Sequence, residues 1–419
     1  MTKVKNFLAG NLVTLLFALL CVGALAASNV TLEFFLQELV TRICRNAVLI
    51  LSLIIPVIAG LGLNFSIVLG AMCAQAGLVL ITHIHLVGIA GIVVCLAVSL
   101  PLSAFMGILM GILFNKTKGQ EMITGMIAGF FANGVYQFIF IALMGSLIPM
   151  EDKNLMLSTG IGLKSTIVLE EGSIKALDNL FLIRCDLFVI FMCIVFILWQ
   201  VYSVMKKRSV PLNKRQLRQK GIGTVAVIAV TAVMSFHPKF HYAMQTFAVP
   251  ALTLLIAVLV AVFCHFLIST KLGQNFRAIG QDMKVAVSAG IDVDRTRIIA
   301  IAISTVLACL GQYISLQNIG SFSTYSAHEN VATFAIAALL VGGASAKTAK
   351  IKHVFIGAAM FHTLFTVAPA VGANLFGDAV FGEYFRIFVS YGVIALSLVF
   401  NAVQSRKLRL NKIRMEAAA

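Results

Sequence analysis

Long apolar runs alternate with short polar segments along nearly the whole chain. Most runs have about the 20 residues that an α-helix needs to cross the hydrocarbon core of a bilayer. They cover residues 11–27, 34–62, 86–114, 121–146, 181–202, 221–236, 245–267, 298–317, 354–371 and 384–403. Two shorter apolar segments, 60–78 and 331–343, predict short or re-entrant helices. The pattern predicts an all-α, polytopic membrane protein of about 10 to 12 transmembrane helices, organised as a single transmembrane domain over residues 1–419.

Composition agrees with this class and excludes an ordinary soluble domain. Hydrophobic residues make up 60% of the 419 and charged residues only 11%, against about a quarter charged in soluble domains. The net charge of +16 does not indicate nucleic-acid binding, because the basic residues cluster at the ends of apolar runs. Lys3, Lys5, the basic loop 205–220 and the tail 406–414 therefore predict a cytoplasmic side that carries both termini. The basic loop also suits contact with anionic membrane lipid.

Cysteine spacing indicates neither a disulfide framework nor a metal site. The eight cysteines stand singly in or beside apolar runs, without a CxxC pair, and are expected to be buried as small hydrophobic residues. The longest segment on the predicted outer side, 147–178, is more acidic than basic. We expect it to be a solvated extracytoplasmic loop, or else a docking surface for a soluble partner.

Polar side chains interrupt several of the apolar runs. Pro56 predicts a kink in the second run, provided that a neighbour satisfies the carbonyl it leaves free. In the glycine-rich segment 60–78 and in the run 121–146, amides and hydroxyls either make helix contacts or line a substrate pathway. The second group shares one helical face beside two phenylalanines, which suits a polyhydroxylated ring. The candidate pathway residues are Asn64, Ser66, Gln75, Asn133, Tyr136 and Gln137.

A polar segment, 271–297, stands between two apolar runs and holds a dense share of the chain's charges. It must lie in water, since each charge at the centre of a bilayer costs about 2.5–3.5 kcal/mol. The alternation of sides places it on the cytoplasmic side. Residues 275–289 predict one short, partly apolar helix that Gly290 ends, and residues 292–297 are expected only to lead the chain back into the membrane. Such an exposed helix usually fills a groove on a partner.

The same segment carries a resemblance to a known family. Its residues, followed by a glycine-rich group after the next span, resemble the branched-chain permeases of ATP-binding cassette importers, and more narrowly those for ribose, other simple sugars or nucleosides. The matching positions are Gly273, Arg277, Ala278, Ile279, Gly280, Ala286, Ala289, Gly290, Ile291, Asp292, Val293, Gly342, Gly343, Ala344, Ser345 and Gly357. The resemblance covers about 34–400. The chain departs from the usual pattern at Asn64, where relatives often have an acidic residue, and after Gly343.

This resemblance implies a type II-like importer permease in a bacterial inner membrane. It implies that 276–290 is a coupling helix that docks on a separate ATPase subunit, with Arg277, Gly280, Ala286 and Gly290 as the coupling residues. It also implies a second permease subunit, either a copy or a relative, and an extracytoplasmic binding protein that delivers the small-molecule substrate. The run 342–348 does not meet the GxxxxGK[ST] pattern. No cofactor is therefore expected in this chain, and ATP and Mg²⁺ would be bound by the ATPase.

Two other classes remain open from the residues alone. An ion-coupled secondary transporter would use ionisable groups in the membrane, for which Asp186, Glu329 and His362 are the candidates. A membrane-embedded enzyme would use paired histidines such as His83 and His85, although no carboxylate pair accompanies them in the sequence.

Overall fold

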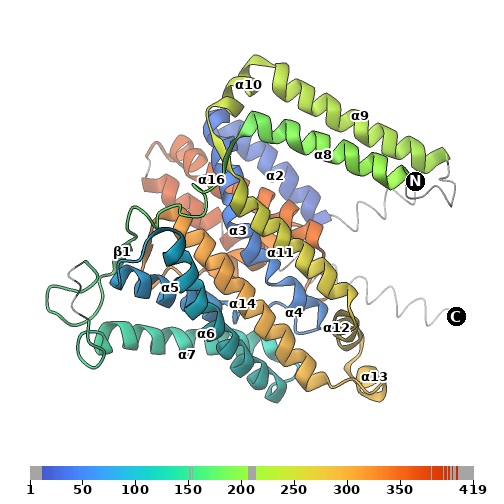
Figure 1. The fold of residues 1–419 in the computed structure, drawn as a ribbon. Helices are drawn as coiled ribbons and strands as arrows, with labels where there is room; N and C mark the ends of the chain where they lie inside the picture. Colours follow the sequence, from blue (N-terminus) through green and yellow to red (C-terminus); the bar gives the residue numbers. More distant parts are fainter. Residues whose placement is uncertain are drawn as a thin grey trace.

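The computed structural model describes residues 12–150, 152, 154–205, 214–378, 380–389, 391–393, 395, 396, 399 and 403 (Figure 1). Its longer helices are α2 (Leu12–Ser28), α3 (Leu32–Leu51), α5 (Ile67–His83), α6 (Gly88–Lys116), α7 (Glu121–Phe138), α8 (Cys185–Met205), α9 (Lys214–Phe236), α11 (Ala251–Ser269), α12 (Lys271–Gln281), α14 (Val293–Ile319), α15 (Val331–Val341) and α16 (Ile351–Phe376). Shorter ones are α4 (Ile54–Ile58), α10 (Pro238–Gln245), α13 (Met283–Ser288) and the π-helix η1 (Ile139–Leu143). Lys3, Lys5, 206–213 of the basic loop and the tail 406–414 lie outside the described residues.

The predicted class is confirmed. Within the described ranges, seven helices are long and apolar enough to cross a membrane, and four shorter apolar helices accompany them. Helices α8 and α9 form a hairpin that projects from the rest of the bundle (Figure 1). The short segment predicted at 331–343 is α15, an 11-residue helix whose residues from Ala335 to Val341 are buried.

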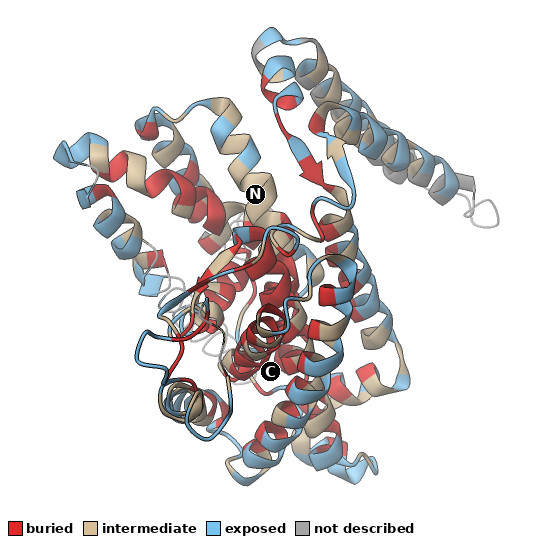
Figure 2. Ribbon diagram, turned by 60° about the vertical axis from the view of Figure 1, so that its left-hand side comes forward, coloured by how far each residue is buried: buried red, intermediate tan, exposed pale blue. Residues whose placement is uncertain are grey.

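Helix α14 forms the centre of the bundle and packs against α6, α5 and α3. It is buried over most of its length (Figure 2). Glycines make these contacts close: a Cβ atom at Gly70 of α5 would lie 2.3 Å from the carbonyl oxygen of Thr305, and one at Gly107 of α6 would lie 2.7 Å from the Cα of Ala302. Small residues allow helix backbones to approach in this way inside a membrane protein. The expectation that the glycine-rich segment 60–78 faces protein is confirmed.

The second apolar run is broken, as Pro56 predicts. Helix α3 ends at Leu51, and α4 begins at Ile54. Proline has no N–H to donate to the carbonyl oxygen four residues earlier, which belongs to Ser52. The hydroxyl of Ser304 on α14 donates to that oxygen at 2.8 Å. The freed backbone group is therefore satisfied by the neighbouring helix, and the kink is fixed against α14.

The segment 147–178 is exposed in part, as at 157–161, and packed in part. Leu155, Leu163 and Leu169 are buried, and strand β1 (Thr166–Val168) pairs antiparallel with β4 (Ser321–Ser323) after α14. The carboxylate of Asp178 is buried and accepts hydrogen bonds from Asn318 and Thr253. A second ladder joins β2 (Leu182–Arg184) to β3 (Ala248–Pro250). The packed part is thus a cover over the end of α14, because its apolar residues are buried there.

Candidate functional site

Polar side chains from three segments meet at His328, in the turn before α15. His328 Nδ1 lies 2.7 Å from Gln75 Oε1 on α5, and His328 Nε2 lies 2.8 Å from Asn133 Oδ1 on α7. Asn133 Nδ2 donates to Glu329 Oε1 at 3.0 Å, and Gln137 Nε2 donates to Asn133 Oδ1 at 3.2 Å. One chain of hydrogen bonds therefore joins α5, α7 and the turn before α15. We call these five residues the His328 cluster.

The protonation of His328 fixes the direction of these bonds. Burial lowers the pKa of His328 to about 4, so the ring is neutral near pH 7 and has one N–H to donate. The amide nitrogen of Asn133 is already used by Glu329, so Asn133 Oδ1 accepts from His328 Nε2. Gln75 must then turn its amide nitrogen toward Nδ1, an orientation that the positions of the heavy atoms permit equally well. In this orientation Gln75 Nε2 donates to His328 Nδ1. Without it, Gln75 Nε2 has no partner among the described residues.

Tyr136 packs beside this cluster without bonding to it. Its ring meets that of His328 edge-on, with 4.8 Å between centroids, and lies 4.4 Å from the ring of Phe140. Its hydroxyl is buried and has no hydrogen-bond partner in the described part of the chain. Gln137 also donates to the carbonyl oxygen of Tyr325 at 3.4 Å, and the Tyr325 hydroxyl donates to that of Leu163. The cluster is thereby connected to the outer cover.

A pocket of about 390 Å³ opens beside the cluster. Among the described residues, its wall has one carboxylate, that of Glu329, and no lysine or arginine. Aromatic rings and hydrogen-bonding groups share the lining, with Phe65, Phe130 and Tyr391 among the rings and Asn133, His328 and Thr333 among the polar groups. Rings stack on apolar faces while amides and carboxylates bond hydroxyl groups. The pocket is therefore suited to a small neutral molecule with several hydroxyls.

The structure divides the predicted pathway residues into two groups. Gln75, Asn133, Tyr136 and Gln137 lie around His328, whereas Asn64 and Ser66 lie in the turn between α4 and α5. Asn64 Nδ2 donates to Ser304 Oγ at 3.1 Å, and Asn64 Oδ1 accepts from the backbone N–H and hydroxyl of Ser66. These two buried side chains hold the turn against α14, and only Phe65 between them reaches the pocket.

His328 was not among the residues predicted from the sequence, and Glu329 was named only as a candidate for ion coupling. Both residues lie at the junction of a polar turn with the short helix α15, which is the one available signal. The separation of 253 residues between Gln75 and His328 hides their contact from any local pattern. Of the other ionisable candidates, Asp186 pairs with Arg184 at 2.6 Å, and His362 is buried at a second cavity of about 340 Å³.

The polar segment 271–297 contains two helices, so the prediction of one helix over 275–289 is wrong. Helix α12 ends at Gln281, and the carboxylate of Asp282 accepts hydrogen bonds from the backbone N–H groups of Lys284 and Val285 to begin α13. This is the geometry of a helix N-cap, which favours a new start over continuation. Gly290, with φ of +78°, follows α13 in the left-handed conformation that glycine accommodates.

Of the four predicted coupling residues, Arg277, Gly280 and Gly290 are exposed and Ala286 is buried. Ala286 is 1% exposed and packs with Ile279 and Val293, so it cannot touch a partner directly. A Cβ atom at Gly280 would lie 2.2 Å from the carbonyl oxygen of Ile58, and Arg277 donates to the carbonyl oxygen of Ile268 at 2.8 Å. These contacts seat α12 against α4 and α11.

Two apolar side chains of α13, by contrast, point outward. Val285 is 65% and Val287 is 61% exposed, although they flank the buried Ala286. Because residues two apart lie on different sides of a helix, the two valines expose apolar surface on both flanks of α13. We call Val285 and Val287 the α13 valine pair.

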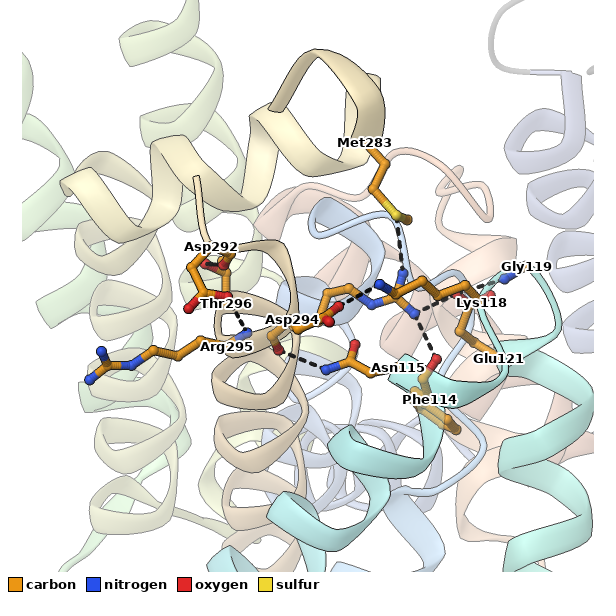
Figure 3. A network of polar contacts seen from close by, with 11 residues as sticks. Phe114, Asn115, Lys118, Gly119, Glu121, Met283, Asp292, Asp294, Arg295 and Thr296 are labelled. Atoms are coloured by element: carbon orange, nitrogen blue, oxygen red, sulfur yellow. Dashed lines mark hydrogen bonds and ion pairs between the residues drawn. The ribbon is translucent and has the colours of Figure 1, made fainter. Parts of the chain in front are cut away.

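The end of the segment does more than lead the chain back into the membrane. Arg297 is fully buried, and its Nη2 donates to Glu121 Oε1 at 2.5 Å and to the carbonyl oxygen of Phe114 at 3.1 Å. Its Nη1 contacts the sulfur of Met283 at 3.9 Å. Its partners Met283, Phe114 and Glu121, labelled in Figure 3, come from α13, α6 and α7. The first turn of α14 therefore contacts α13, the end of α6 and the start of α7.

Two features of this helical membrane protein are typical of a transport permease. One is the buried polar cluster beside a pocket, and the other is α13, a short helix outside the long apolar helices. Residues 45–398 match the family described as branched-chain amino acid transport system / permease component. The chain belongs to this family, and its role is that of a transport subunit and not of an enzyme.

One curated relative has a related sequence. The xylose transport system permease protein XylH of Haemophilus influenzae is 26% identical over 215 residues, which are 51% of this chain and 54% of the relative. The match thus spans about half the length of the relative. No solved structure matches the chain.

Proposed function

We propose that this chain is the permease subunit of an ATP-binding cassette importer and forms the translocation pathway for a simple sugar or a nucleoside. The family gives the class, and the relative named as a xylose permease supports a sugar before a nucleoside. The observation that carries the substrate class is the pocket beside the His328 cluster, whose lining combines amide, imidazole and carboxylate groups with aromatic rings.

The charges around the pocket favour a neutral substrate. Glu329 presents a carboxylate that accepts hydrogen bonds from hydroxyl groups, and Asn133 offers an amide beside it. A phosphorylated or carboxylated sugar would place its negative charge near Glu329 without a lysine or arginine of the described lining to compensate. Phe65 and Phe130 offer rings for the apolar face of a sugar or for a nucleobase.

The energy for transport would come from a separate ATPase subunit. The α13 valine pair supplies the apolar contact that a groove on such a subunit would bury, and Ala286 beneath it packs α13 on this chain. ATP and Mg²⁺ would be held by the ATPase, and this chain needs no cofactor of its own. ATP-driven movement would reach the pocket by shifting the population of inward-open and outward-open states.

The remaining partners follow from the same class of transporter. A second permease subunit, either a copy or a relative, would complete the pathway, and an extracytoplasmic binding protein would deliver substrate to the face that carries β1 and β4. The complex would lie in a bacterial inner membrane with both termini of this chain in the cytoplasm, in agreement with the basic loop and tail.

Reconstitution tests this function and separates it from ion-coupled transport. The permease is placed in lipid vesicles with its ATPase and binding protein, and uptake of labelled xylose, ribose and uridine is measured. We expect uptake of at least one of them only with hydrolysable ATP, and no loss when a protonophore is added. Uptake that continues with a non-hydrolysable ATP analogue and stops with the protonophore would contradict the proposal in favour of a secondary transporter.

A further inference from the structure

The side-chain polar contacts that join helix α7 to the bundle, in the part of the chain that the structure describes, lie near its two ends. Its buried residues are Glu121 at the start, two glycines, and Tyr136 in the last turn. Between them the helix presents large apolar side chains outward, including Ile127 at 60% and Phe131 at 75% exposed. The polar contacts of its last turns are those of Asn133 and Gln137 in the His328 cluster. A rigid helix with polar contacts at both ends can carry a displacement from one end to the other.

The first end of α7 is fixed by Arg297. Glu121 accepts a hydrogen bond from Arg297 Nη2 at 2.5 Å and also receives the backbone N–H of Gly119 at 3.0 Å. The arginine is fully buried, and Glu121 is 9% exposed. A buried ion pair stabilises a protein little compared with apolar side chains of the same size, so packing alone does not explain its presence. The ion pair instead fixes the position of the Arg297 guanidinium relative to the Glu121 carboxylate.

Arg297 contacts α13 as well as α7. Its guanidinium touches Met283, the first residue of α13. Met283 and Glu121 lie on separate elements, α13 and α7 (Figure 3). A force applied to α13 by a docked partner would therefore act on the residue that holds the start of α7. From Glu121 to Asn133, α7 spans about 18 Å at 1.5 Å per residue.

We propose that Arg297 is a positioning residue that makes α13 and α7 move as one unit, so that movement of the partner-facing helix displaces Asn133 at the pocket. The role of this link in transport rests on the proposed function. The link itself is a property of this chain alone. The exposed pair Lys118 and Asp294, 2.5 Å apart, lies at the same side of the protein, but both of its side chains are over 40% exposed and it does not touch Met283.

The link is tested first in the purified full-length chain in lipid. Spin labels are attached at Val285→Cys on α13 and Phe131→Cys on α7, both exposed, with Cys193 replaced by serine because it is the one native cysteine of the described chain that is not buried. Electron–electron dipolar spectroscopy then gives the distribution of distances between the labels. Glu121→Gln, which keeps the size of the side chain and removes its charge, should broaden this distribution, and Asp294→Asn should leave it unchanged.

A double variant separates positioning from stability. Glu121→Met with Arg297→Met replaces the pair by apolar side chains of similar length, which buried sites often tolerate. We expect a folded permease with a broad distance distribution. In vesicles containing the ATPase and without spin labels, we expect ATP hydrolysis to continue while substrate uptake per ATP falls about tenfold or more.

Narrow distance distributions in both Glu121→Gln and the folded double variant would overturn the proposal, and so would normal uptake per ATP in that double variant. If the double variant does not fold, Glu121→Gln alone decides the question. A wild-type chain that shows the link but no ATP-dependent uptake would contradict the proposed function and leave the link standing.

Discussion

His328 Nε2 and Asn133 Oδ1 lie 2.8 Å apart, although 195 residues separate them in the chain. This contact fastens the turn before α15 to α7, and Glu329 strengthens it by accepting from the other end of the same amide. Asn133 is half-buried and lies at the pocket wall, so it can exchange one of these bonds for a bond to a substrate. A residue placed in this way affects both the geometry of the cluster and the binding of substrate.

Replacement of Asn133 by leucine should therefore reduce uptake. Leucine has a similar size but leaves His328 and Glu329 without their shared partner, a loss of about 1–3 kcal/mol, and we expect uptake to fall about tenfold or more. Phe131→Leu, on the exposed face of the same helix, is the control and should transport normally. Uptake kinetics in vesicles provide the measurement. Unchanged kinetics in Asn133→Leu would remove this residue from the pathway.

The buried imidazole of His328 should make the stability of the permease depend on pH. Its pKa falls from 6.5 to about 4 on burial, so the unfolded chain binds the proton more readily than the folded one between these values. Stability should therefore decrease as the pH falls from about 6.5 toward about 4, with about 3 kcal/mol lost over the whole range. Thermal unfolding midpoints in detergent measure this, and His328→Gln should show a flatter decrease. Parallel pH profiles for the two proteins would contradict the predicted titration.

Charges placed on α13 should have opposite consequences at neighbouring positions. Val287→Asp introduces a carboxylate on an exposed side chain, so the permease should fold normally but lose binding to its ATPase. Ala286→Asp buries a charge between α12 and α14 and should lower the stability of the permease itself. Copurification with the ATPase and the unfolding temperature distinguish these results. Normal ATPase binding by Val287→Asp would show that the α13 valine pair is not the contact.

Gly280→Ala should disturb the seat of α12 on α4. The added Cβ would lie 2.2 Å from the carbonyl oxygen of Ile58, a distance that only a backbone shift can relieve, and we expect a cost of about 1–3 kcal/mol. Gly134→Ala on α7 is the matched control, since nothing lies within 4 Å of its Cβ position, and it should be neutral or slightly stabilising. Thermal unfolding checks both. Equal midpoints for Gly280→Ala and the wild type would show that Gly280 and the carbonyl oxygen of Ile58 are not in close contact.

Hydropathy predicted the class of helical membrane protein because a membrane helix must satisfy its own backbone and hide few charges, and both requirements can be read from consecutive residues. The break at Pro56 was predictable for the same local reason. The division at Asp282 was also visible in principle, since aspartate is a preferred N-cap residue. The apolar residues on both sides concealed it. The buried leucines of the outer cover were likewise present in the sequence, where the acidic charge directed attention away from them.

Contacts between distant segments could not be predicted from one sequence. Four of the six candidate pathway residues lie around His328, but nothing local connects α5 and α7 to the turn before α15. The burial of Ala286 could not be predicted for the same reason. Both of its neighbours on α13 are apolar too, and only the packing against α12 and α14 decides that Ala286 is the buried one. Arg297 was assigned to a connecting turn since its partner, Glu121, lies 176 residues earlier.

Substrate protection in working vesicles tests whether the pocket beside the His328 cluster is part of the translocation pathway. A cysteine is introduced at Thr333, a partly exposed residue of α15 that lines the pocket, and its labelling by a water-soluble maleimide is followed while the complex imports sugar with ATP. The transported sugar should slow labelling at Thr333→Cys, and a sugar phosphate should not. Labelling at the same rate with and without the sugar, in vesicles that still take it up, would contradict the assignment of this pocket to the pathway.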